Sequence, residues 1–142
     1  MPKTDDTIQI MDTLARYAIA MDQRDWPLLG SVFTQNFTYD AGEWTTHSLA
    51  DYLERLQPYL EGCGPTQHLL GNYQIDIDGD TARTQVYVRA FHVGTRELSS
   101  TTYEMFGVYR DEMRRTEAGW RSIRRTLRLQ YELGSREVLR PA

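Results

Sequence analysis

The sequence predicts an α+β domain in which about three N-terminal helices pack on one face of a curved antiparallel sheet. Two observations support this fold class. Helical spacing of apolar residues and helix-start signals are confined to the chain before Pro65, whereas the chain after it alternates apolar and polar residues over long stretches. We expect a cone-shaped sheet around a pocket for one small ligand. The length of 142 residues is typical of one domain, so residues 1–142 are expected to fold as a single unit.

The first helix is expected to begin at Thr4, where a hydroxyl followed by two carboxylates suits a helix N-terminus. Its apolar residues recur at steps of three and four along one stripe, namely Ile8, Met11, Ala15 and Ala18. The next member of that stripe is Asp22, at a helix end where the dipole disfavours a carboxylate. A nearby histidine cation would remove this conflict. Otherwise Asp22 is a solvated acid that starts the loop or caps the next helix.

Two shorter helices are expected next. Asp25-Trp26-Pro27 is typical of a cap followed by proline in a first turn. Ser48, with Asp51 three residues later, predicts the start of a third helix. Pro58 and the run Gly62-Cys63-Gly64-Pro65 predict its end.

Long strands are expected after Pro65, with shorter ones near residues 37–40 and 43–46. The first long strand opens near His68 and ends at the hairpin turn Asp78-Gly79. The others cover about residues 82–92, 101–113 and 120–131. Along the second, one face carries Val86, Val88, Ala90 and His92, which places the His92 imidazole at the mouth of the cone.

Composition and charge narrow the function. The chain is 40% hydrophobic and 25% charged, as in folded globular proteins. A net charge of −4 provides no basic field, which argues against nucleic acid or an anionic membrane as the partner and leaves a small molecule or a protein. Cys63 is the only cysteine, so an intrachain disulfide is impossible. An acidic N-terminus without a long apolar run favours a cytoplasmic protein.

Several catalytic motifs are absent. The sequence has no glycine-rich phosphate loop, no G-x-S-x-G elbow and no H-E-x-x-H helix, which argues against phosphoryl transfer, serine hydrolysis and zinc proteolysis. The spacing of His47, His68 and His92 matches no metal-ligand motif, so no metal or other cofactor is expected. His47 could complete a three-histidine site only by swinging toward the mouth. Its place just before Ser48 favours a loop.

The remaining candidates each have a plainer alternative. His68 is either a functional residue near the helix ends or a polar residue at a strand end. His92 either directs its imidazole toward the mouth of the cone or is a hydrogen-bonded histidine at the sheet edge. Tyr17 and Tyr39 can donate to a carbonyl oxygen, although tyrosine often only packs. Cys63 is expected to be a bystander. The expected packing residues, some of them pocket wall, are Trp26, Phe33, Val88, Ala90, Tyr103, Met105 and Phe106.

Six short segments between residues 7 and 129 occur in a specific order and spacing. They are Arg16-Tyr17-Ala18, Met21-Asp22-Gln23-Arg24-Asp25-Trp26, Thr66-Gln67-His68, Asp78-Gly79-Asp80-Thr81-Ala82, Tyr109-Arg110-Asp111 and Gly119-Trp120-Arg121. In these segments the chain resembles the SnoaL-like branch of the nuclear transport factor 2-like superfamily. Within that branch it is similar to scytalone dehydratase, bile acid 7α-dehydratase and hexachlorocyclohexane dehydrochlorinase.

The resemblance implies an Asp22–His68 acid/base dyad. Tyr17 or Tyr39 would donate a hydrogen bond to the substrate carbonyl, and His92, as a second histidine, would assist as a donor. Met21 stands where scytalone dehydratase has a functional tyrosine, which argues against the same substrate. The implied activity is a cofactor-independent lyase or isomerase, most plausibly dehydrating a small cyclic or polyketide-like carbonyl compound. The alternatives are a polyketide cyclase, a dehydrohalogenase, a non-catalytic ligand carrier, or a dioxygenase small subunit.

The outer face of the sheet is expected to mediate self-association. Its residues are expected to be Arg83, Tyr87, Arg89, Arg121, Ile123, Arg125, Leu127 and Leu129. An arginine-rich apolar surface of this kind suits an interface. The related proteins imply a homo-oligomer, with a trimer expected and a dimer as the alternative.

Overall fold

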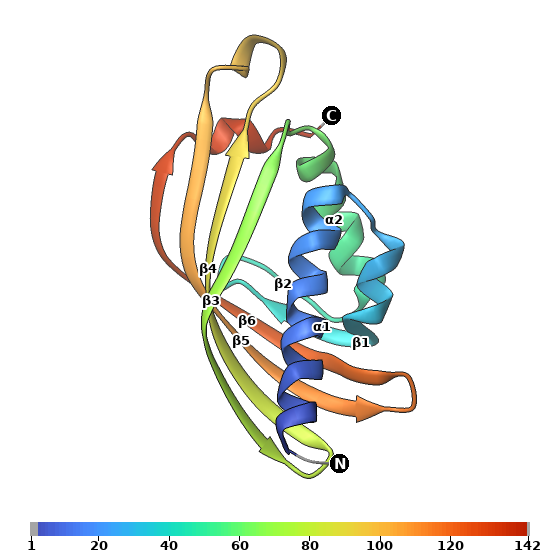
Figure 1. Cartoon of the computed structure of the whole chain (residues 1–142). Coiled ribbons are helices and arrows are strands. Elements are labelled where there is room, and N and C mark those ends of the chain that lie inside the picture. Colours follow the sequence, from blue (N-terminus) through green and yellow to red (C-terminus); the bar gives the residue numbers. More distant parts are fainter. Residues whose placement is uncertain (1–2, 142) are drawn as a thin grey trace.

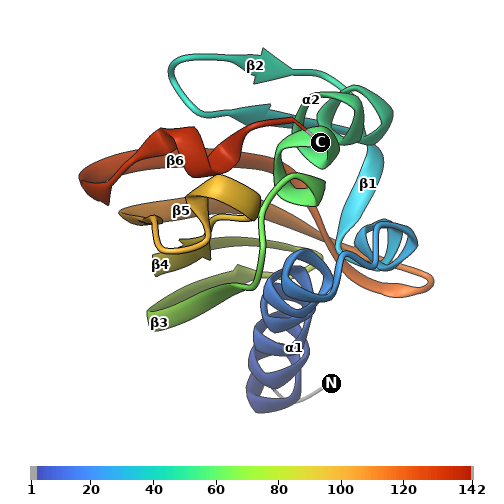
Figure 2. The same ribbon diagram turned by 90° about the horizontal axis from the view of Figure 1, so that it is seen from above.

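A six-stranded, strongly curved sheet wraps around two α-helices, which both lie on its concave side (Figures 1 and 2). The computed structural model describes residues 3–141. The helices are α1 (Lys3–Gln23), α2 (Leu49–Glu61) and the short 3-10 helices η1 (Pro27–Ser31), η2 (Arg96–Leu98) and η3 (Arg136–Leu139). The strands are β1 (Phe33–Asp40), β2 (Thr45–Thr46), β3 (Thr66–Asp78), β4 (Thr81–Val93), β5 (Thr102–Thr116) and β6 (Gly119–Gly134). The α+β class and the curved sheet are as the sequence predicts.

The sheet is mixed, although the sequence predicts an antiparallel one. Its order is β2-β1-β6-β5-β4-β3, and every neighbouring pair is antiparallel except β1 and β6, which run parallel. The strands β3 to β6 follow one another as antiparallel neighbours. Two-residue turns join β3 to β4 and β5 to β6, whereas residues 94–101, which include η2, join β4 to β5. β1 is separated from β6 by most of the chain, so local turn signals do not determine how it pairs.

Of the second and third expected helices, only the third is an α-helix. Residues 27–31 form only a 3-10 turn, whose N-cap is Trp26 and not the expected Asp25. The Asp25 carboxylate still accepts a hydrogen bond from the Leu28 N–H at 3.2 Å. The Ser48 hydroxyl accepts from the Asp51 N–H at 3.0 Å, as the capping signal predicts. Pro58 does not end α2. It removes one N–H donor, and the last turn continues until the Gly62 N–H bonds to the Pro58 carbonyl at 3.1 Å.

The buried face of α1 is not the stripe that the apolar spacing predicts. Ile10 and Leu14 are fully buried on the face that meets the sheet, whereas Ile8 is 53% and Met11 38% exposed. The helix carries two apolar stripes offset by about two residues, and helical spacing alone does not tell which one faces the sheet. Ala18 is buried and Asp22 half-buried at the border of the two faces, where α1 packs along β3.

The long strands bring the candidate residues together by their register. His68 on β3 lies opposite Ala90 on β4, and His92 on β4 lies opposite Thr66 on β3 and Tyr103 on β5. Inward residues alternate along β4 as predicted, so Val86, Ala90 and His92 are buried. No helix within residues 3–141 has the length and hydropathy needed to cross a membrane.

Candidate active site

A cavity of about 400 Å³ opens between the concave face of the sheet and the two α-helices. Its volume lies in the usual range for a small-molecule site. The expected site residues that line it are Tyr17, Tyr39, His68, Ala90, His92, Tyr103 and Met105. The rest of the wall combines aliphatic side chains with the aromatic rings of Trp44, Tyr52 and Tyr59. Its charged side chains, among the described residues, are Glu43, Arg55 and Arg136.

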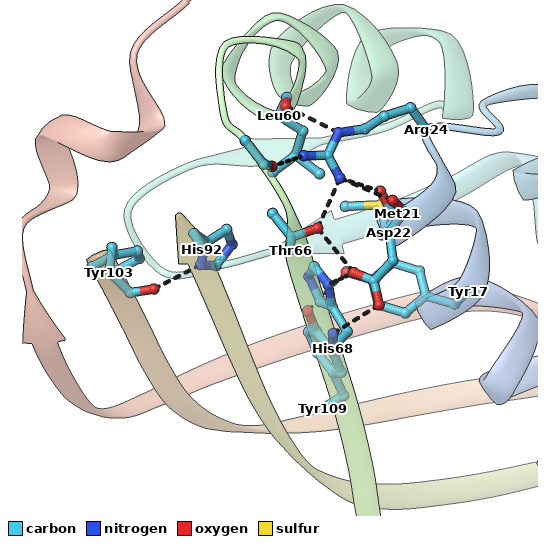
Figure 3. A network of polar contacts seen from close by, with 11 residues as sticks. Tyr17, Met21, Asp22, Arg24, Leu60, Thr66, His68, His92, Tyr103 and Tyr109 are labelled. Carbon is cyan, nitrogen blue, oxygen red and sulfur yellow. Dashed lines mark hydrogen bonds and ion pairs between the residues drawn. The ribbon is translucent and has the colours of Figure 1, made fainter. Parts of the chain in front are cut away.

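His68 on this wall is hydrogen-bonded to Asp22, which lies behind it and does not itself line the cavity (Figure 3). The Asp22 Oδ1 lies 2.7 Å from His68 Nδ1, and Oδ2 accepts the His68 backbone N–H at 2.9 Å. The carboxylate therefore fixes both the ring and the backbone of His68. Because Nδ1 is engaged by Asp22, Nε2 is the ring nitrogen that can exchange a proton with a substrate.

Thr66 and Arg24 support the carboxylate from behind. The Thr66 hydroxyl donates to Asp22 Oδ1 at 3.0 Å and accepts from Arg24 Nη1 at 2.7 Å. Arg24 has a positive φ of 57° and also donates to the carbonyls of Leu60 and Gly64, at 3.0 and 2.8 Å. The end of α1, the end of α2 and the start of β3 are thereby joined next to the dyad.

These contacts determine the ionisation of Asp22. Partial burial raises its pKa, but the hydrogen bonds from the His68 ring, the His68 backbone and the Thr66 hydroxyl outweigh burial. The net pKa of Asp22 is below its ordinary value. Asp22 is therefore a carboxylate at neutral pH, able to orient the imidazole and to stabilise an imidazolium.

His92 also faces the cavity, and its imidazole is neutral there. Its ring lies 5.7 Å from the His68 ring, and Nδ1 is 3.1 Å from the Tyr103 carbonyl oxygen. A carbonyl only accepts, so Nδ1 carries the proton. Burial, and then the charge of a protonated His68, lower the pKa of His92 from 6.5 to about 4. The neutral ring presents Nε2 as an acceptor.

Tyr17 belongs to a buried phenol pair. Its hydroxyl is 2.8 Å from the Tyr109 hydroxyl, and its ring meets the His68 ring edge-on at 6.0 Å. The Arg125 guanidinium lies 4.2 and 4.1 Å from the centroids of the Tyr17 and Tyr109 rings. Burial raises the pKa of Tyr109 well above 10, so this phenol is protonated at neutral pH and can donate.

A fully buried ion pair lies behind the two phenols. Arg125 Nε donates to Asp111 Oδ1 and Oδ2 at 2.9 and 3.1 Å, and both side chains have no exposed surface. Within residues 3–141 the two terminal nitrogens of Arg125 have no hydrogen-bond partner. Its guanidinium lies against aromatic ring faces instead, so its positive charge acts on the phenols.

Comparison with known proteins identifies the family. The family model for the SnoaL-like domain matches residues 2–126. The chain belongs to the SnoaL-like domain family. The uncharacterized protein Rv2910c of Mycobacterium tuberculosis is 31% identical over 123 residues, which cover 84% of this chain and 82% of that protein.

Solved structures show the same fold. The Kfla4162 protein of Kribbella flavida matches with a TM-score of 0.89 and 25% identity, over 96% of this chain and 98% of that one. A candidate scytalone dehydratase of Novosphingobium aromaticivorans shares the fold, with a TM-score of 0.80 and 22% identity over 93% and 91% of the two chains. The resemblance read from the sequence is confirmed at the level of family and fold.

Four of the expected pocket residues of this SnoaL-like domain do not line the cavity. Phe106 lies on the outer face of the sheet, where the Arg89 guanidinium covers it at 4.8 Å, because inward and outward residues alternate and Met105 already faces inward. Phe33 is stacked on Phe37 in the core, with centroids 4.1 Å apart. Val88 is buried in the core. Trp26 donates from its indole N–H to a Glu61 carboxylate oxygen at 2.9 Å.

The remaining candidates are His47, Cys63 and Tyr39. His47 is exposed, and residues 3–141 contain no group of three or more potential ligands arranged to hold a metal ion. The buried Cys63 thiol donates to the carbonyls of Tyr59 and Val138, at 3.3 and 3.2 Å, and burial raises its pKa, which does not suit a nucleophile. Tyr39 lines the cavity beside Trp44 and Tyr52, with both centroid distances 4.9 Å.

Proposed function

We propose that the protein is a cofactor-independent lyase that dehydrates a small cyclic or polyketide-like carbonyl compound. The observation that carries this proposal is the 2.7 Å hydrogen bond between Asp22 and His68, with His68 on the wall of a cavity of about 400 Å³ that is rich in aromatic side chains. A base oriented by a carboxylate in such a cavity suits the removal of a proton from a carbon next to a carbonyl.

The first step is proton abstraction. His68 Nε2 takes the proton from the carbon beside the carbonyl, and the electron pair of the C–H bond forms an enolate. Asp22 stabilises the imidazolium that results. Tyr17 and Tyr109 share one hydrogen bond between their hydroxyls, so one phenol proton remains to donate to the enolate oxygen. Arg125 strengthens that donor through its charge.

The second step is the loss of the hydroxyl group. The His68 imidazolium returns the proton to the departing hydroxyl, the C–O bond breaks, and the enolate collapses to a conjugated C=C–C=O with release of water. His92 Nε2, an acceptor, suits a hydrogen bond from a substrate hydroxyl. This replaces the donor role that the sequence favoured for His92.

The dyad also fits related reactions. Loss of a halide in place of hydroxide gives dehydrohalogenation, and attack of the enolate on a second carbonyl gives cyclisation. A non-catalytic ligand carrier, or a small subunit of a ring-hydroxylating dioxygenase, would not need an ionised Asp22 hydrogen-bonded to His68. Copurification with a large iron–sulfur subunit would favour the latter.

Proton exchange tests the first step without knowledge of the leaving group. Cyclic β-hydroxy ketones are incubated in D₂O, and exchange at the carbon beside the carbonyl is followed by NMR while enone formation is followed by absorbance. We expect His68→Ala and Asp22→Asn each to slow exchange by about 10²–10⁴-fold, the usual contribution of a positioned acid/base. Equal exchange in wild-type and His68→Ala, with folding shown by circular dichroism, would refute the proposal.

Independence from metal is part of the proposal. Proton transfer, enolate stabilisation and orientation are sufficient for elimination beside a carbonyl, where the C–H bond is already acidified. We expect exchange and elimination rates to be unchanged after exhaustive chelation. Stoichiometric zinc or iron by elemental analysis, with activity restored only by the metal, is the contrary result.

A further inference from the structure

We propose that Arg55 binds a carboxylate of the ligand at the mouth of the cavity, so that the substrate is an anionic ring compound. This inference rests on the proposed function and adds the class of substrate to it. Its basis is a cation that lines the cavity and has no acidic partner.

The position of Arg55 on α2 aims it at the cavity. Tyr52, Leu56 and Tyr59 also line the cavity, and the spacing of these residues around Arg55 places all four on one face of the helix. The guanidinium lies over the Trp44 ring, 5.0 Å from its centroid. An aromatic platform of this kind holds the cation in place while leaving its N–H groups free for a planar acid.

The other charged groups at the mouth are paired with one another. Arg136 contacts both Glu43 oxygens at 3.3 Å and is paired with Glu132. Glu132 also accepts the Tyr103 hydroxyl at 2.6 Å. Within residues 3–141, Arg55 makes no ion pair and its interaction is with Trp44. It is the lining cation whose charge remains available to a ligand.

A carboxylate is the group that matches this environment. A guanidinium presents parallel N–H donors that fit the two oxygens of a carboxylate. The cavity of about 400 Å³ limits the ligand to a compound of small size, so one molecule would reach both Arg55 and His68. The structure therefore favours a hydroxylated ring that carries a carbonyl for the dyad and a carboxylate for Arg55.

A pair of probes of the same shape tests this without turnover. Binding of 4-hydroxybenzoate and of 4-hydroxybenzamide is measured by titration calorimetry at low and high salt. We expect the wild-type protein to bind the acid about tenfold more tightly than the amide, the order of a charged hydrogen bond. This preference should shrink as salt is raised. Arg55→Gln should weaken acid binding to that of the amide and leave amide binding unchanged, and Arg55→Lys should keep part of the preference.

Two controls separate the possible outcomes. Arg83→Gln changes an exposed arginine on the outer face and should leave both affinities unchanged. His68→Ala should keep the acid preference, since the dyad acts on the reacting carbon. Equal binding of acid and amide, an acid preference that survives Arg55→Gln, or no binding of either probe would overturn the role of Arg55. If Arg55 does not bind the acid but His68→Ala still slows proton exchange in D₂O, only the substrate class is refuted and the proposed lyase function is retained.

Discussion

Thr66 is a single residue that helps to hold the Asp22 carboxylate in place, and this role can be tested by substitution. Its hydroxyl donates to the same Asp22 oxygen that contacts His68, at 3.0 Å. Thr66→Val keeps the shape and removes this donor, so we expect the rate of proton exchange to fall by about tenfold, the worth of one charged hydrogen bond. Thr66→Ser keeps the hydroxyl and should stay near wild-type. An equal loss in both variants would show that packing, not the hydrogen bond, matters here.

His92 should make stability depend on pH. The pKa is about 4 in the folded protein and 6.5 as its ordinary value, so between these pH values the unfolded chain binds more protons. Its contribution to stability is complete above about pH 6.5 and is lost as the pH falls toward 4, by about 3 kcal/mol in all. Urea unfolding between pH 4 and 7 measures this slope. His92→Gln should reduce it, and an unchanged slope in that variant would contradict the assignment.

The sequence identifies the dyad but misses the groups behind it. Asp22 and His68 are predictable because a carboxylate at a helix end and a histidine at a strand start are unusual, and the family resemblance pairs them. Asp111 and Arg125 look like surface charges. Strand alternation is the signal that could have found them, since Tyr109 and Asp111 share the inward face of β5 with Met105. A β-bulge in β6 obscures the same alternation for Arg125.

At the scale of elements, α1 is anchored to the sheet by one buried acid. Asp6 accepts from Arg115 Nη1 and Nη2 at 2.6 and 2.9 Å and from the Trp120 indole at 3.2 Å. The Arg115 hydrogen bonds outweigh burial and lower the pKa of Asp6 from 3.8 to about 2. The anchor should therefore be intact above about pH 4 and should be lost as the pH falls toward 2.

Removing this anchor should loosen the start of α1. We expect Asp6→Ala to lower the melting temperature and to increase hydrogen exchange in the first turns of the helix, while the dyad at its other end keeps its contacts. Glu97→Gln is the matched control, because Glu97 pairs with Arg140 in an exposed setting at 3.1 Å and such pairs contribute little. Equal melting temperatures for Asp6→Ala and wild-type would exclude the anchor.

The elements are predictable where local signals decide them. Alternation and the short turns predict the hairpins β3–β4 and β5–β6, and Ser48 predicts the start of α2. The parallel pairing of β1 depends on contacts distant in the sequence. The stripe of α1 fails for a different reason: Ile8 and Met11 satisfy helical spacing, but the side that faces the sheet depends on how the whole helix docks.

At the scale of the whole molecule, the outer face of the sheet carries an apolar surface different from the expected one. Arg125 is buried in the interior, and Leu127 and Leu129 line the cavity. These residues lie on the inward face of β6, so they do not contribute to an outer interface. The exposed apolar residues on the outer strand faces are Leu69 (57%), Tyr87 (48%), Phe91 (39%), Tyr131 (63%) and Leu133 (46%).

This surface, defined by Leu69, Tyr87, Phe91, Tyr131 and Leu133, should bind a second and third copy of the chain. Large side chains this exposed on one face are typical of an interface, and arginines such as Arg89 border it. Light scattering at micromolar concentration should give about three times the chain mass of 16.5 kDa. Tyr131→Glu should shift the mass toward the monomer, because a carboxylate would be buried without a partner. Ile8→Glu, on the exposed side of α1, should leave the trimer intact. A dimer mass would correct the number of copies, and a wild-type monomer would refute self-association.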